Sequence, residues 1–225
     1  RSVNNLEFES VIGYSFQNPE YLDRALTHSS YNKEMKTHHV DNERLEFLGD
    51  AFFDAIISVE LFRRMGHVTE GKLTKTRAQV VCERSLAETA RRLNVGKYIN
   101  MGHGEDSAGG RHKDSILADA MEAIIGAIFL DGGYDSAQKF VVAAFDETSE
   151  KAAAGTLFSD YKSEIQELLQ ANITYEIDRE EGPAHDKTFY VRLECNGQVL
   201  GRGSGKSKKE AEQNAARAAL ERGEI

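Results

Sequence analysis

The sequence predicts two domains of different class: an all-α domain over residues 1–148 and a small α+β domain over residues 160–225, joined by a linker over residues 149–159. Three observations support this prediction. Apolar residues recur at helical spacing before residue 150, without strand-like alternation. In the last third of the chain, "TFYVRLEC" alternates in the manner of a half-buried strand. Between these regions, "SEKAAAGTLFSD" is the stretch of small and polar residues that best fits a linker.

The first domain reads as a succession of helices. Asn18 and Pro19 form a helix start, with Asn as the cap and Pro at the first helical position. Residues 42–55, "NERLEFLGDAFFDA", have the pattern of an amphipathic helix. Further along the chain we expect one or two helices over 72–96 with Gly96 as a C-terminal stop, a loop over "GHGEDSAGGR", an apolar helix over 114–130 that ends at "DGG", and one more helix over 134–150.

The second domain has the order α-β-β-β-α. "YKSEIQELLQ" is the first helix, and "ITYEI" and "TFYVRLEC" are the first two strands. Asn196-Gly197 is a two-residue hairpin turn that leads into a third strand, "QVLGRG". The Ala-rich segment "KKEAEQNAARAALER" closes the domain as a helix. A helix pair packed on one face of a small antiparallel sheet is therefore expected.

Composition excludes several classes of protein. With 225 residues, 40% apolar and 29% charged, the chain is expected to be globular, and the longest apolar stretch, 116–130, is too short for a membrane span. No signal-peptide core is found at the N-terminus, which points to the cytoplasm. Cys82 and Cys195 are expected to be reduced thiols, without zinc spacing around them. The net charge of −9 argues against a protein that simply coats nucleic acid.

One face of the helix at 42–55 consists of acids. Glu43, Glu46 and Asp50 are spaced i, i+3, i+7 and fall within roughly 60° of one another around the helix axis. Like charges so placed repel by a few tenths of a kcal/mol per pair. The opposite face is an apolar stripe of Leu45, Leu48, Phe52 and Ile56. Taken alone, the acidic stripe is more simply explained as a solvated face than as a functional one.

A second pair of acids changes that interpretation. Asp119 and Glu122 are the only charged residues in the apolar stretch 116–130. Two carboxylates on one face of a buried helix cannot both be ionised without compensation. A cation bound by Glu46, Asp50, Asp119 and Glu122 would provide it, and oxygen ligands of this kind suit Mg²⁺, with Mn²⁺ as a substitute. Glu70 is a possible further member, or simply a helix-start acid. Mg²⁺ held by carboxylates typically serves phosphate chemistry.

A lysine cluster marks the second domain. Ser207 and Glu210 form a capping box at the start of the last helix. Lys206, Lys208 and Lys209 therefore lie at a helix N-terminus, where free N–H groups and the helix dipole favour an anion.

The sequence as a whole resembles the ribonuclease III family, in its bacterial form with one catalytic domain and one double-stranded-RNA-binding domain. "ALTHSSY", "NERLEFLGDA", "EGKLTKTRA" and "GGRHKDSILADAMEAIIGAIFLDGG" follow the family's catalytic signatures in order. The resemblance implies metal ligands at Glu46, Asp50, Asp119 and Glu122, and further active-site acids at Glu43 and Glu70. It also implies a homodimer in which each subunit cuts one strand, leaving 3′ overhangs. Phe47, on the acidic flank of its helix, matches an aromatic that contacts the partner subunit, with packing inside its own domain as the alternative.

The second domain is similar to a double-stranded-RNA-binding domain through "GPAHDKTF" and "GRGSGKSKKEAEQNAA". Such domains bind A-form RNA by shape across two minor grooves. The match implies minor-groove contacts from Gln166, Gln170 and His185. Two features depart from the family. The segment between Gln170 and Ile173 is very short, either as a true deletion or because residues are missing, and residues 160–225 carry 10 Lys and Arg against 13 Asp and Glu.

The leading hypothesis is therefore a Mg²⁺-dependent endoribonuclease of double-stranded RNA that acts in RNA processing, on rRNA precursors and mRNA. One alternative is a non-catalytic dsRNA-binding or ribosome-associated protein with the same fold. Another is a metal-dependent hydrolase of small phosphates with an incidental RNA domain. Arg111 and Lys113 are equally compatible with phosphate contacts and with solvated charges.

Overall fold

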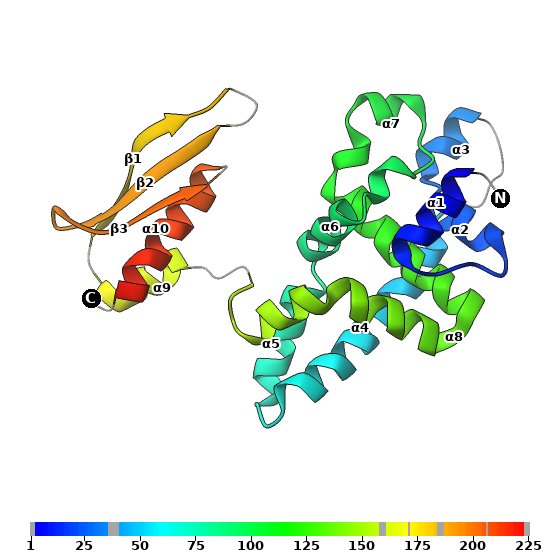
Figure 1. Ribbon diagram of the computed structural model, residues 1–225, viewed down its shortest axis with the longest axis horizontal. Helices are drawn as coiled ribbons and strands as arrows, with labels where there is room; N and C mark the ends of the chain where they lie inside the picture. Colours follow the sequence, from blue (N-terminus) through cyan, green and yellow to red (C-terminus); the bar gives the residue numbers. More distant parts are fainter. Residues whose placement is uncertain are drawn as a thin grey trace. The chain divides into compact units, whose positions relative to one another are not determined.

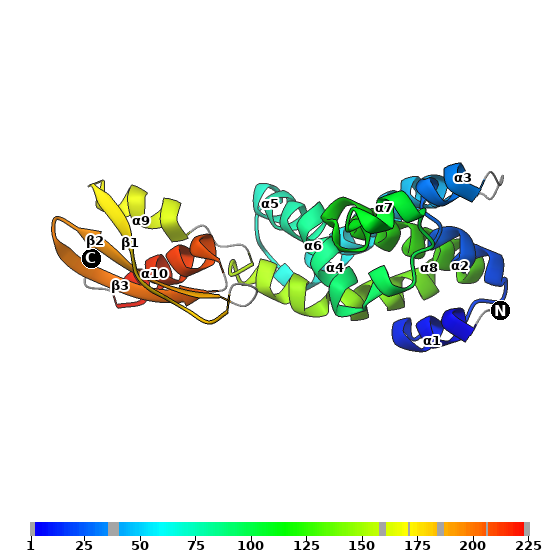
Figure 2. The same ribbon diagram turned by 90° about the horizontal axis from the view of Figure 1, so that it is seen from above.

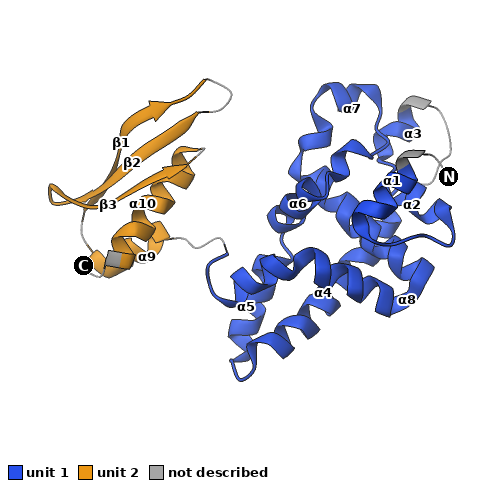
Figure 3. Ribbon diagram, in the orientation of Figure 1, with its two compact units in different colours: residues 1–157 blue, residues 158–225 orange. Residues whose placement is uncertain are grey.

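The computed structural model describes residues 3–35, 41–157, 161–170, 172–183, 187–205 and 207–222. The chain divides into two compact units, Arg1–Leu157 and Phe158–Ile225 (Figure 3). In the described part of the chain, the first unit is helical and the second combines three strands with two helices (Figure 1), which confirms the predicted fold class. Within the described residues, no helix is both long and apolar enough to cross a membrane.

The first unit is built around two long helices, α4 and α8, which lie against each other over much of their length (Figure 1). Shorter helices surround this pair, with α2, α5 and α6 in contact with α8. The helices are α1 (Val3–Ile12), α2 (Pro19–Ala25), α3 (Ser29–Met35), α4 (Glu43–Met65), α5 (Glu70–Val80), α6 (Glu83–Arg92), α7 (His103–Ser107) and α8 (Asp114–Ala153), with 3₁₀ turns at Val95–Lys97 and Gly110–His112.

Several of the predicted helix starts are confirmed. The side chain of Asn18 caps α2 by accepting a hydrogen bond from the N–H of Glu20, and Pro19 follows at the first helical position. The two predicted helices over 114–130 and 134–150 correspond to α8, which is interrupted by a non-helical residue at Gly133 (φ 76°). Asp131, at this interruption, accepts hydrogen bonds from Tyr14, Gln17 and Asn18 and so ties α8 to the segment before α2.

Three boundary predictions need correction. Gly96 does not end the helix over 83–92, because Asn94 takes the left-handed conformation (φ 54°) and Gly96 lies in the 3₁₀ turn that follows. The predicted loop "GHGEDSAGGR" contains α7. Residues 149–153 of the expected linker are the last turns of α8, with Ser149 and Ala152 buried. Small residues here form a helix that packs, since alanine has the highest helix propensity.

Two glycines allow α4 and α8 to approach closely. A Cβ atom at Gly49 would lie 1.7 Å from the carbonyl oxygen of Glu122, and one at Gly126 would lie 2.3 Å from the carbonyl oxygen of Leu45. The backbones are therefore in direct contact at this point. The buried stripe of α4 is also broader than predicted. Leu45 and Ile56 are buried as expected, but Phe53 and Ile57 are fully buried too, while Phe52 is half-buried and stacks on Phe129.

The second unit is an antiparallel sheet with both helices on one face (Figure 2). Its elements are α9 (Tyr161–Leu169), β1 (Ile173–Glu181), β2 (Thr188–Cys195), β3 (Gln198–Gly205) and α10 (Lys208–Arg222), with strand order β1-β2-β3. The turn at Asn196-Gly197 is confirmed, since both residues have positive φ, 51° and 80°. Val191 and Leu193 of the alternating strand face the core.

The helix α10 lies unusually close to β3. A Cβ at Gly201 would lie 2.2 Å from the carbonyl oxygen of Ala215, and one at Gly203 would lie 2.2 Å from the amide nitrogen of Ala215. Ala211, Ala215, Ala216 and Ala219 of α10 are buried together with Ile165, Val191 and Leu193, and larger side chains such as Tyr175, Phe189 and Leu220 pack against them. The contact between α10 and β3 is thus a seam of glycine against alanine, which we call the glycine–alanine seam.

Candidate metal centre and nucleic-acid interface

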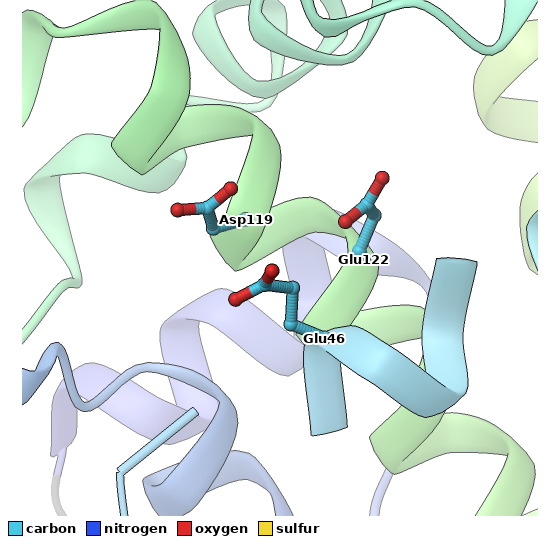
Figure 4. A group of neighbouring side chains, drawn as sticks. All are labelled: Glu46, Asp119 and Glu122. Carbon is cyan, nitrogen blue, oxygen red and sulfur yellow. The ribbon is translucent and has the colours of Figure 1, made fainter. Parts of the chain in front are cut away.

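Three carboxylates meet where α4 and α8 cross. Glu46 projects from α4, and Asp119 and Glu122 project from α8 toward it (Figure 4). One carboxylate oxygen from each lies within 4.8 Å of the others. We call these three residues the acidic cluster. The contact of Gly49 with the backbone of Glu122 brings the two helices close enough for the cluster to form.

The acidic cluster is electrostatically strained. Burial is the main cause that raises the pKa of Glu122 to about 8, and the neighbouring charges of Asp50 and Glu46 raise it further. Burial likewise raises the pKa values of Asp119 and Glu46, with added repulsion from nearby acids. Half-buried carboxylates in mutual contact favour either protonation or a bound cation. Hard oxygen ligands of this kind suit a divalent ion such as Mg²⁺ or Mn²⁺.

Two further predicted acids lie beside the cluster. Asp50 is outside the group that shares the 4.8 Å distance, yet among neighbouring charges it has the largest effect on the pKa of Glu122. Glu43 lines a cavity of about 340 Å³ together with His28, Ser29, Asn42, Glu46 and Asp119. We call this the acidic cavity. The structure therefore brings five of the six predicted carboxylates to one region.

The sixth carboxylate, Glu70, is placed differently. It is the first residue of α5, and its side chain accepts a hydrogen bond of 2.8 Å from the hydroxyl of Thr74. It is exposed and is not part of the acidic cluster or the acidic cavity. Within one chain, Glu70 has the position of an ordinary helix-start acid.

Phe47 is exposed, with 80% of its surface accessible. The alternative interpretation, that it packs inside its own domain, is therefore wrong. An aromatic ring of this size on the surface, next to Glu46, is available to another molecule.

Arg111 and Lys113 are engaged within the chain. The Arg111 guanidinium makes two hydrogen bonds to the carboxylate of Asp106 and two more to the carbonyl oxygens of Gly96 and Ile99. Lys113 forms an ion pair of 2.6 Å with Glu105. The sequence left two alternatives open for Arg111, a solvated charge or a phosphate contact, and the structure supports neither. The side chain of Arg111 instead holds the loop before α8 together.

The second unit presents the predicted lysines at the start of α10. Lys208 and Lys209 are exposed, and the hydroxyl of Ser207 caps the helix by accepting a hydrogen bond of 3.1 Å from the N–H of Glu210. Gln166 is exposed on α9, and Gln170 is exposed just beyond its end with a left-handed backbone (φ 47°). Lys206 and His185 lie outside the described residues.

Sequence reasoning missed one side chain at this centre. His28, in the segment between α2 and α3, lines the acidic cavity. The sequence signal for it is its place in the motif "ALTHSSY".

A helical unit with a cluster of carboxylates, followed by an α-β-β-β-α unit with a capped lysine helix, is the arrangement expected of a nuclease that acts on double-stranded RNA. Comparison with known proteins agrees. Residues 18–147 match a family model described as "Ribonuclease-III-like", and residues 161–222 match one described as "Double-stranded RNA binding motif". The chain belongs to the ribonuclease III family, the endoribonucleases specific for double-stranded RNA.

Similar proteins cover almost the whole chain. Ribonuclease 3 of Caldanaerobacter subterraneus is 46% identical over 216 residues, which span 94% of this chain and 95% of the relative. Ribonuclease 3 of Clostridium perfringens is 45% identical over 230 residues, spanning 100% and 97%. Among solved structures, a nuclease domain of ribonuclease III from Campylobacter jejuni matches with a TM-score of 0.59 and 40% identity, covering 63% of this chain and 95% of that one. That nuclease domain has structural flexibility in a region involved in dimer formation.

Proposed function

We propose that this protein hydrolyses phosphodiester bonds of double-stranded RNA with Mg²⁺, which Mn²⁺ would replace, at the acidic cluster. The observation that carries the proposal is the meeting of Glu46, Asp119 and Glu122 at the crossing of α4 and α8 in a chain that also has a double-stranded-RNA-binding motif. We assign the first unit, Arg1–Leu157, to catalysis and the second unit, Phe158–Ile225, to RNA binding.

Glu46, Asp50, Asp119 and Glu122 are proposed as the metal ligands. Mg²⁺ bound there would activate a water molecule and neutralise charge on the oxygens of an in-line displacement. Asp50 and Glu122 are the residues we assign directly to catalysis. Glu122 must release its proton to act as a ligand, because burial holds its pKa at about 8 in the absence of a cation. Glu43, in the wall of the acidic cavity, is proposed as a supporting acid.

We propose that the protein is a homodimer joined through its first unit, in which each subunit cuts one RNA strand and leaves a 3′ overhang. Two exposed aromatic residues support this: Phe47 and Phe62, with 80% and 68% of their surfaces accessible. Phe62, Leu61 and Leu73 line an apolar hollow of about 180 Å³. In a two-fold interface both subunits use the same surface, so every contact occurs twice, once in each direction. Phe47 of each subunit would therefore enter this hollow of the other. Glu70 of α5 is proposed as an active-site acid in that assembly.

RNA contacts are proposed for the second unit. Lys206, Lys208 and Lys209 would bind phosphates, and Gln166, Gln170 and His185 would reach the minor groove. Because this unit carries more acids than bases, its affinity depends on where the lysines are placed and should be strongly salt-sensitive. We further propose that it acts in the cytoplasm on structured RNA, including precursors of rRNA and mRNA.

The test is incubation of a long duplex RNA with the protein and Mg²⁺, followed by electrophoresis of the products. Cleavage to short duplexes with 3′ overhangs is expected. Glu122→Gln should abolish cleavage and leave duplex binding largely intact, because it removes a metal ligand of the first unit and changes nothing in the second. Intact RNA under conditions where the wild-type protein binds it would favour the non-catalytic alternative. Cleavage of nucleotides but not of duplex would favour a small-phosphate hydrolase.

The proposed homodimer is tested separately by measuring the mass of the protein in solution. Light scattering should give a mass near twice 25.0 kDa. Phe47→Ala should shift this mass toward one subunit, whereas Leu130→Ala, which also removes an exposed apolar side chain of the same unit, serves as the matched control. A wild-type mass of 25.0 kDa at micromolar concentration would contradict the dimer.

A further inference from the structure

His28 stands out among the residues that line the acidic cavity. The other ionisable side chains of that lining, Glu43, Glu46 and Asp119, are all carboxylates. A histidine in this position is the one ionisable group of the described lining that can donate a hydrogen bond while the carboxylates are ionised. It is half-buried and is not among the six acids assigned above.

The backbone around His28 is fastened to the helix that carries the cluster. The carbonyl oxygen of Thr27 accepts a hydrogen bond of 2.9 Å from the N–H of Asn42, the residue just before α4. On its other side, the N–H of His28 donates to the carbonyl oxygen of Asn100 at 3.0 Å. The position of His28 relative to Glu43 and Glu46 is therefore set by direct backbone hydrogen bonds.

Ser30 determines which ring nitrogen of His28 carries the proton. The N–H of Ser30 donates to Nδ1 at 3.3 Å, and the Ser30 hydroxyl lies 2.8 Å from the same atom. That hydroxyl oxygen already accepts from the N–H of Gly102 at 3.0 Å, which leaves its own proton to donate to Nδ1. A nitrogen that accepts cannot bear a proton, so the neutral ring carries its proton on Nε2. None of the residues described accepts a hydrogen bond from Nε2.

A donor in this cavity has an evident use if the cluster binds RNA as proposed above. A phosphate brings negatively charged oxygens to a wall of carboxylates, which repels them wherever no cation or donor intervenes. We propose that His28 donates a hydrogen bond from Nε2 to a non-bridging oxygen of the RNA phosphate at the acidic cluster, and that Ser30 is a positioning residue that acts through His28. The ring keeps its proton throughout, so the proposal involves a hydrogen bond and no proton transfer.

Two substitutions separate this contact from a structural one. His28→Gln places an amide donor near the position of Nε2, whereas His28→Asn places its amide near Nδ1, where it still meets Ser30. The substrate is a duplex RNA with one cleavage site. The single-turnover cleavage rate is measured at saturating protein and Mg²⁺, and duplex affinity is measured separately without divalent ions. Thermal unfolding is followed for every variant.

The proposal predicts that His28→Asn slows cleavage about 100-fold, the usual cost of removing one donor to a developing anion. His28→Gln should be slowed about tenfold or less, and duplex affinity should stay within about threefold of wild type for both. Ser30→Ala, which removes only one of the two donors to Nδ1, should slow cleavage less than His28→Asn without changing duplex affinity.

The opposite order of rates, with His28→Asn faster than His28→Gln, would assign His28 to the scaffold and overturn the proposal. So would restoration of the His28→Asn rate when Mg²⁺ is raised above the concentration that saturates the wild-type protein, which would indicate a role in metal binding, or a loss of rate that follows a fall in unfolding temperature in both variants. Failure of the wild-type protein to cleave the duplex would instead contradict the proposed function, which keeps the two failures distinct.

Discussion

The close contact between α4 and α8 gives a quantitative prediction for Gly49→Ala. The added Cβ would lie 1.7 Å from the carbonyl oxygen of Glu122, whereas real Cβ atoms essentially never come closer than 3.0 Å. The obstacle is backbone, which cannot rotate away as a side chain can. The two helices must therefore separate by roughly 1.3 Å at this point.

That displacement would disrupt the proposed metal site. Oxygen ligands of Mg²⁺ lie about 2.1 Å from the ion, so two ligands on one ion are at most about 4.2 Å apart. The cluster, with its oxygens within 4.8 Å of one another, needs only a small closure to reach this limit. A further separation of about 1.3 Å removes Glu46 from reach of an ion held by Asp119 and Glu122. We expect metal affinity to fall at least 10- to 100-fold, and the free energy of unfolding to fall by about 3 kcal/mol or more.

The assay is isothermal titration with Mg²⁺ or Mn²⁺, together with urea unfolding followed by circular dichroism. Gly71→Ala is the matched control, because Gly71 lies in helix α5 with nothing within 4 Å of an added Cβ. The free energy of unfolding of the Gly71→Ala variant should rise by about 0.5–1 kcal/mol. Wild-type metal affinity and stability in Gly49→Ala would refute the reasoning, since the two helices would then not depend on this contact for their spacing.

Three further predictions concern charge. In metal-free protein the free energy of unfolding should fall as pH rises from about 4.5 to about 8, because folded Glu122 (pKa about 8) retains a proton that the unfolded chain releases. Urea titrations over this pH range should show the fall, Mg²⁺ should oppose it, and Glu122→Gln should reduce it; a flat profile would contradict the assignment. Lys209→Ala should weaken duplex binding and lower the salt slope by about one, whereas Arg217→Ala, near the other end of α10, should do neither in a salt-dependent binding assay. Arg111→Lys should cost about 1–3 kcal/mol in urea unfolding by losing the two-pronged contact with Asp106, and an unchanged midpoint would refute this.

The acidic cluster was predictable because the residue types alone indicate its chemistry. Asp119 and Glu122 are isolated acids in an apolar helix, and such acids need a partner. The fold class was predictable for a similar reason, since alternation around Val191 and Leu193 and the Asn196-Gly197 turn are local signals.

What escaped prediction depends on contacts between distant segments. The role of Gly49 becomes visible only when Glu122 lies against it, because a glycine inside a helix otherwise reads as a mild defect. His28 joins the carboxylates through backbone hydrogen bonds of Thr27 to Asn42, which no periodicity reveals. Asn94 competes with Gly96 as a helix stop, and local propensity alone ranks the glycine first.

The glycine–alanine seam has a consequence for how the protein responds to heat. The alanines of this seam, Ala211, Ala215, Ala216 and Ala219, each bury little apolar surface, and small domains are already marginal in stability. No larger side chain can be added at Gly201 or Gly203 to compensate. The second unit should therefore melt before the first. On warming, the protein would lose its hold on long duplexes while its chemistry was still intact, so temperature would act first on substrate choice and only later on activity.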